Sequence, residues 1–141
     1  MFQQTITVSC PQRGLHDITK TVVGVVGESR IERGMCNLFV RHTSASLTIQ
    51  ENSDPDVRRD LEAFFRRMVP DGDPIYRHTM EGPDDMPAHV CAALTTTSLV
   101  IPVVDGRLAL GRWQGIYLWE HRKRVRERSV LITVWGEQAW G

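Results

Sequence analysis

Polar side chains that can bind metals, phosphates or protons interrupt a strand-like apolar alternation at residues 41–52. This stretch contains His42, four small hydroxyl side chains, Glu51 and two amides. A strand used only for packing would carry Val, Ile or Thr there. Two further histidines, His78 and His89, follow later in the chain. A first hypothesis is that these distant segments converge on one polar pocket.

The three histidines are the candidate metal ligands. A lone histidine is more often structural than a ligand, but His42, His78 and His89 each lie near the end of a predicted element, where sites collect. Each also has a hydroxyl or carboxylate close in sequence that can fix its tautomer. Three imidazoles suffice for an open tetrahedral site with water in the fourth position. Because no pair has HxH or HxxxH spacing, the spacing alone gives only a weak metal signal.

Three further polar residues are candidate catalytic groups. Glu51 directly follows the hydroxyl-rich strand, and Asp60 lies at the margin of the next helix; a solvated surface acid is the alternative for both. Gln114 is a polar amide between Trp113 and an apolar strand, a position that often faces a site. A pair of acids at 84–85 begins a predicted helix, where capping and catalysis both remain open.

Five cations fall within residues 122–128. A solvated loop and an anion site are both compatible with such a run. Arginine forks match phosphate geometrically, so phosphate or diphosphate is the natural ligand. The arginines expected to bind it are Arg124, Arg126 and Arg128.

The elements that must position these residues fit one α+β domain over residues 1–141, with a largely antiparallel sheet and two or three packed helices. Helices are expected after Asp17, from Asp54-Pro55 and over 84–95. The second helix should bury a stripe of Val57, Leu61, Phe64, Phe65 and Met68. Strands are expected at 6–10, 35–40, 46–50 as the hairpin partner of 35–40, 99–104, 108–110, 116–120 and 129–135.

Composition limits the function classes. Hydrophobic and charged contents of 41% and 24% are ordinary for a soluble domain, and 17 cations balance 17 acids. Nucleic acid is therefore an unlikely partner for a broad surface. No apolar run approaches a membrane span, and the beginning of the chain has no features of a secretory signal. We expect a cytoplasmic protein whose scattered cysteines are buried, reduced thiols.

Several motifs resemble those of the YjbQ-like family, described as secondary thiamine-phosphate synthases. The match spans nearly the whole chain and runs through residues 42–47 with Glu51-Asn52, 76–78, 81–89, Trp113-Gln114 and 118–122, ending at Arg128. The resemblance implies a small α+β fold, a compact homotrimer and a polar pocket lined by the shared histidines. It also implies bound metal, zinc among others, in that pocket.

Three functions follow as expectations. The first is a thiamine-phosphate synthase-type transferase that joins a pyrimidine diphosphate to a thiazole phosphate, with magnesium as the expected metal. The second is a zinc-dependent hydrolase, because hard phosphate-bound Mg²⁺ prefers oxygen ligands whereas histidines suit zinc. The third is a non-catalytic trimeric metabolite-binding module. In each case the expected ligand is a small phosphorylated metabolite.

Overall fold

The computed structural model describes residues 1–124 and 126–138, which form three helices and eight strands. In chain order these are β1 (Phe2–Cys10), β2 (Gly14–Asp17), α1 (Thr19–Ser29), β3 (Ile31–Val40), β4 (Ala45–Glu51), α2 (Pro55–Met68), α3 (Asp85–Leu94), β5 (Ser98–Val104), β6 (Arg107–Leu108), β7 (Gln114–Glu120) and β8 (Arg126–Gln138). The predicted α+β class is confirmed.

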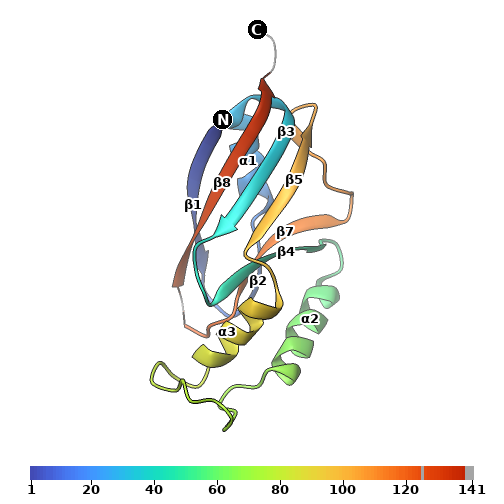
Figure 1. The fold of residues 1–141 in the computed structure, drawn as a ribbon. Helices are drawn as coiled ribbons and strands as arrows, with labels where there is room; N and C mark the ends of the chain where they lie inside the picture. The colour runs from blue at the N-terminus through green and yellow to red at the C-terminus, as the bar shows by residue number, and fades with distance from the viewer. Residues whose placement is uncertain (125, 139–141) are drawn as a thin grey trace.

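The strands form two antiparallel sheets. The larger has five strands in the order β1-β8-β3-β5-β6, and the smaller has three in the order β2-β7-β4. Helices α2 and α3 lie at the end of the molecule opposite the two termini, beside the smaller sheet (Figure 1). That end carries the candidate site.

The main core lies between the two sheets and α1. Alternate residues of the long strands point inward, so that Leu38, Ile101 and Ile132 are buried while their neighbours face outward. Val22 of α1 and Leu118 of β7 pack against them. Three β-branched residues of α1, Val22, Val25 and Val26, form its buried face, where their stiff side chains pack against the sheets.

A smaller core joins α2 to the other face of the three-stranded sheet. Leu61 and Phe65 of α2 pack against Tyr117 and Trp119 of β7. The wider buried stripe predicted for this helix is wrong: the structure has no buried residue in α2, and Phe64 is 51% exposed. The helix covers one side of a narrow sheet, so only part of its apolar face finds a partner.

The predicted hairpin between 35–40 and 46–50 is also wrong. Strand β4 pairs with β7, and β3 already has β8 and β5 on its two edges. With both edges of β3 occupied, the chain leaves the larger sheet after Val40 and starts β4 in the smaller one. Strand β2 was not predicted at all, because four residues give too short a pattern.

Local signals predicted the helix starts more accurately. Asp54 is the N-cap of α2, its side chain accepts a hydrogen bond from the Asp56 amide, and Pro55 opens the helix. Asp17 accepts from the Thr19 amide at the start of α1. Within the described residues, none of the helices combines the length and apolar character needed to cross a membrane.

Candidate metal centre

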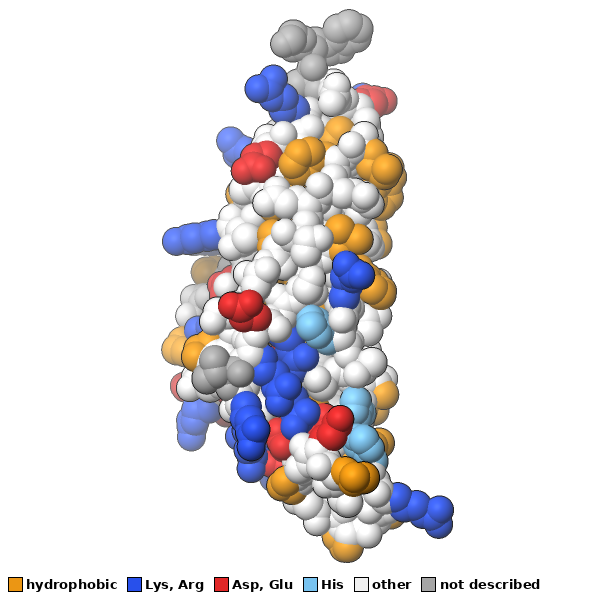
Figure 2. Space-filling model, turned by 90° about the vertical axis from the view of Figure 1, so that its left-hand side faces the viewer, with side chains coloured by type: hydrophobic (Ala, Val, Ile, Leu, Met, Phe, Trp, Pro, Cys, Tyr) orange, Lys and Arg blue, Asp and Glu red, His pale blue; other side chains and the backbone are white. Residues whose placement is uncertain are grey.

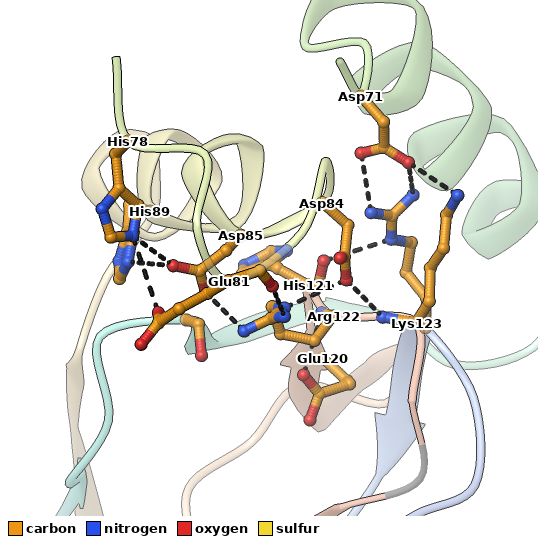
Figure 3. A network of polar contacts seen from close by, with 12 residues as sticks. Asp71, His78, Glu81, Asp84, Asp85, His89, Glu120, His121, Arg122 and Lys123 are labelled. Carbon is orange, nitrogen blue, oxygen red and sulfur yellow. Dashed lines mark hydrogen bonds and ion pairs between the residues drawn. The ribbon is translucent and has the colours of Figure 1, made fainter. Parts of the chain in front are cut away.

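Helix α3 presents an aspartate and a histidine one turn apart. Asp85 and His89 are spaced i, i+4 and therefore lie on the same helix face. His78, from the loop before the helix, approaches the same carboxylate. Asp85 Oδ2 lies 2.6 Å from His78 Nε2 and 3.0 Å from His89 Nε2, as Figure 3 shows. Two imidazoles thus converge on one carboxylate oxygen.

His89 is oriented from behind by the backbone. Its Nδ1 lies 2.9 Å from the Thr43 carbonyl oxygen, which can only accept a hydrogen bond. Nδ1 therefore donates its proton to Thr43, and Nε2 is the ring nitrogen directed toward Asp85. This arrangement is typical of metal-binding histidines, whose second nitrogen donates to a carbonyl or carboxylate.

Asp85 is held from its other side by Arg122. Arg122 Nη1 donates to Asp85 Oδ1 at 2.5 Å, and its Nε donates to Asp84 Oδ2 at 3.0 Å. Burial alone would raise the pKa of Asp85, but the hydrogen bond from His78 and the charges of Arg122 and His89 lower it. Similarly, burial is outweighed at Asp84, where Arg122 and the Lys123 amide bring the pKa to about 2. Both aspartates are therefore ionised at neutral pH.

A second buried ion pair anchors this arrangement to the sheet. Glu120, fully buried, accepts from the Arg122 amide at 2.9 Å and from Arg128 Nε at 2.5 Å. Arg128 also donates to the Ser44 hydroxyl at 2.9 Å. Because Ser44 follows Thr43, the same loop that orients His89 is fixed by this pair. The two arginine–carboxylate pairs make a rigid support behind the centre.

The donor set fits a divalent metal. His78, Asp85 and His89 each offer one ligand atom, and these atoms lie within 4.8 Å of one another. Both histidine nitrogens lie at hydrogen-bond distance from Asp85 Oδ2, closer than two ligands of one ion would lie, so the rings would move away from the carboxylate on binding. The side chains of His78 and His89 are 45% and 32% exposed, which leaves room for that movement. Two histidines and one carboxylate leave further coordination positions open, as catalytic sites require.

His42 does not join this centre within the chain. Its Nε2 accepts a hydrogen bond from the Ser129 amide at 2.8 Å, so the lone pair that would bind a metal is already engaged. Burial and the nearby Arg128 charge lower the pKa of His42, which keeps the ring neutral. Of the three predicted ligands, the structure brings His78 and His89 together with Asp85 and leaves His42 outside that group.

The predicted catalytic residues lie elsewhere in the chain. Glu51 and Gln114 pair across the β4–β7 ladder, whereas Ala45 and Glu120 pair at its other end. Six residue steps of about 3.4 Å separate the two ends by roughly 20 Å. Glu51 accepts from the Ser53 and Asp54 amides, and the Gln114 side chain accepts from the Gly111 amide. Both residues thus shape turns at the far end of the sheet, and Asp60 is exposed on α2.

The three predicted phosphate-binding arginines have different surroundings. Arg128 is buried in its pair with Glu120 and is not free to hold an anion. Arg126 is half-buried, and its Nε has no hydrogen-bond partner among the described residues. Arg124 is exposed, and Arg77 is exposed directly before His78. The face drawn in Figure 2 carries histidine, acidic and basic side chains next to one another.

Sequence reasoning left Asp85 open between capping and catalysis and gave no special role to Arg122. The spacing of Asp85 and His89 was the available signal, because i, i+4 on a helix places two ligands side by side. No comparable signal existed for Arg122, whose aspartate partners are 37 and 38 residues away.

Fold and site together define a small α+β protein with a preorganised histidine–aspartate centre at one end. The chain belongs to the UPF0047 YjbQ-like family, whose model matches residues 4–137. It is 51% identical to the UPF0047 protein sll1880 of Synechocystis sp. over 96% of this chain and 92% of that protein. It is 45% identical to UPF0047 protein YjbQ of Escherichia coli O157:H7, over 96% and 99% of the two chains.

Solved structures show the same fold. A hypothetical protein of Aeropyrum pernix K1 superposes with a TM-score of 0.89 and 31% identity, over 97% of this chain and all of that one. A YbjQ-like protein of unknown function from Sulfolobus solfataricus gives a TM-score of 0.87 at 28% identity, covering 96% and 97% of the two chains.

Proposed function

We propose that the protein is a zinc-dependent hydrolase of a small phosphate ester. The observation that carries the proposal is the convergence of His78 Nε2 and His89 Nε2 on Asp85 Oδ2, with His89 held by the Thr43 carbonyl and Asp85 by Arg122. Two nitrogens and one oxygen form a ligand set suited to zinc, whereas phosphate-bound Mg²⁺ prefers oxygen alone. The exposed Arg77, next to His78 in sequence, favours an anionic substrate.

A zinc ion in this site would supply a Lewis acid and a water whose pKa is lowered to about 7. The chain's own residues then act around it. Thr43 fixes the His89 tautomer, and Arg122 fixes the Asp85 carboxylate. Glu81, 64% exposed with Oε2 3.6 Å from His78 Nε2, is the carboxylate placed to accept a proton from the attacking water.

The proposed reaction balances as ester plus water giving phosphate and alcohol. The water oxygen forms a bond to phosphorus, the bond from phosphorus to the alcohol oxygen breaks, and Glu81 returns the proton to the leaving alkoxide. Arg77, next to His78 in sequence and exposed, can approach the phosphate oxygens.

The test is hydrolysis of p-nitrophenyl phosphate by protein stripped with a chelator and then reloaded. We expect turnover to be lost on stripping and restored by zinc. His78→Ala should abolish it, and Glu81→Gln should lower it while zinc stays bound. His16→Ala is the matched control, because His16 lies on β2 and contacts the Gln12 carbonyl instead. A zinc-loaded protein that hydrolyses no phosphate ester in a broad panel would refute the proposal.

Thiamine-phosphate synthase activity remains a prediction from the resemblance. That reaction needs cations to neutralise a leaving diphosphate. Arg122 and Arg128, two of the five cations in the run, are already neutralised in buried pairs. The hydrolase proposal needs fewer free cations and is favoured on that ground.

We also propose that the protein acts as a homotrimer in the cytosol. The outer face of the five-stranded sheet carries Phe39, Val100, Val104 and Trp135, each at least 40% exposed. Exposed apolar side chains grouped on one face are typical of subunit contacts. The three cysteines are free and buried, which suits a reducing compartment. Light scattering on the eluting protein tests the trimer, and a monomer mass would contradict it.

A further inference from the structure

A cavity of about 290 Å³ opens beside the candidate metal centre. It is formed by the loop between α2 and α3 together with the first turn of α3. Its apolar walls are Pro74, Tyr76, Pro83 and Met86, and His78 and Thr79 lie at its polar side. His78 therefore belongs both to the cavity lining and to the group of metal-binding atoms.

The residues that line the cavity favour an apolar portion of a ligand. Small-molecule sites are lined mainly by hydrophobic and aromatic side chains with few polar groups. The Tyr76 ring is half-buried, and burial followed by the Asp73 charge raises the pKa of its hydroxyl, so the ring stays neutral. The one carboxylate of the lining, Asp73, already accepts from the Ile75 amide. Neither lysine nor arginine lines the cavity among the described residues, so it does not suit a second phosphate.

The size of the cavity limits that ligand part further. A cavity of about 150 Å³ lined by apolar side chains admits benzene. The present cavity, at about 290 Å³, is large enough for a substituted aromatic ring. A flat ring can lie against Tyr76 and the two prolines, which are rigid and leave little conformational entropy to lose.

We propose that this cavity binds an aromatic ring of the substrate, carried by the alcohol side of the phosphate ester whose phosphate lies at His78, Asp85 and His89. This inference rests on the proposed hydrolase function and names its substrate class as aryl or arylmethyl phosphates. His78 connects the two parts of the site, because one ring borders both. The loop between α2 and α3 then determines which alcohol group is bound. The buried ion pairs hold the histidine–aspartate centre in place for the reaction.

The test compares two non-hydrolysable probes by calorimetry on zinc-loaded protein. Phenylphosphonate and methylphosphonate share the phosphonate group and differ in the ring. Burial of the ring should make phenylphosphonate bind about tenfold more tightly or better. Thr79→Trp, which fills the cavity, should abolish that preference, so that the two phosphonates bind with similar affinity.

Met80→Trp is the matched control, because Met80 is the next residue, is 98% exposed and does not line the cavity. A second variant, Tyr76→Ala, removes the aromatic wall and should reduce the preference, whereas Tyr76→Phe should retain it. These two variants keep the test decisive if Thr79→Trp does not fold.

The outcomes separate the two proposals. Equal affinity for both phosphonates, with zinc bound and hydrolysis intact, would overturn the aromatic subsite alone. Preference for phenylphosphonate in a protein that binds zinc but hydrolyses no ester would overturn the hydrolase and leave the ring-binding cavity standing. An unchanged preference in both Thr79→Trp and Tyr76→Ala would show that the ring binds elsewhere.

Discussion

The two oxygens of Asp85 serve opposite partners: Oδ1 faces Arg122 Nη1 at 2.5 Å, while Oδ2 faces His78 Nε2 at 2.6 Å. Asp85 is only 2% exposed, and these contacts keep its carboxylate ionised and fix its orientation. Asp85 therefore belongs both to the buried ion pair with Arg122, which stabilises the fold, and to the candidate metal centre. Changes at either partner should therefore affect both properties.

Replacement of Arg122 should destabilise the fold. Arg122→Met leaves two buried aspartates without their cation, and breaking a buried pair in this way costs about 3–5 kcal/mol. Urea denaturation in the presence of a chelator measures the change. Arg124→Met is the control, since Arg124 is exposed, and it should cost less than about 0.5 kcal/mol. Equal stability of the two variants would mean that the Arg122 pairs are not formed in solution.

Replacement of Asp85 should lower zinc affinity more than replacement of a residue that only orients a ligand. Asp85→Asn keeps the size of the side chain but loses the charge and one anionic ligand. Outer-shell changes cost about 10–100-fold in metal affinity, so we expect a larger loss here. Competition with a fluorescent chelator gives the affinity. Glu81→Gln should retain zinc while turnover falls. Zinc affinity retained in Asp85→Asn would remove the carboxylate from the ligand set.

The loss of folding stability at acidic pH should depend on His121. Burial, followed by the charges of Arg13 and Arg128, lowers its pKa to about 3 in the fold, and its Nε2 lies 2.8 Å from the Ser46 hydroxyl. An unfolded histidine has a pKa of about 6.5, so the unfolded chain binds more protons as pH falls below that value. The stabilisation is complete above pH 6.5 and is lost progressively down to about pH 3.

The comparison with His121→Gln isolates this effect. Between pH 6.5 and 5.5 the wild type should lose about 1 kcal/mol more stability than the variant. Chemical denaturation at each pH gives the two slopes. Parallel slopes would mean that His121 is already solvated or charged in the folded protein.

Because β7 covers only part of the apolar face of α2, the two phenylalanines of this helix should contribute differently to stability. Phe65 packs against Trp119 with ring centroids 4.5 Å apart and the ring planes tilted by 53°, whereas Phe64 is 51% exposed. We expect Phe65→Ala to destabilise by about 2–3 kcal/mol and Phe64→Ala by less than about 1 kcal/mol. Thermal or urea unfolding compares them directly. A larger loss at Phe64 would indicate that its face is covered, for example by another subunit.

Elements with local signals were predictable from sequence. Asp54-Pro55 identified the start of α2 because capping and proline geometry act within a few residues. Partner choice between strands is non-local, and the pairing of β4 with β7 depends on the edges of β3 being taken by strands much later in the chain. Hydrophobic pattern gives the face of a strand but not its neighbour.

The same distinction applies to the site. His78 and His89 were identified by residue type, but the partners that decide their role are a backbone carbonyl and a carboxylate brought together by folding. His42 looked equivalent in sequence, yet the amide that engages it belongs to Ser129, 87 residues away. Residue types thus suggested a metal-binding site, but only the tertiary contacts show which histidines lie in it.

The most direct test of the centre is the zinc content of protein purified without added metal, measured for the wild type, His89→Ala and His42→Ala. With all three proteins folded by circular dichroism, the wild type and His42→Ala should carry equal, stoichiometric zinc and His89→Ala should carry almost none. Equal zinc in the wild type and His89→Ala, or loss of zinc in His42→Ala alone, would contradict a centre built from His78, Asp85 and His89.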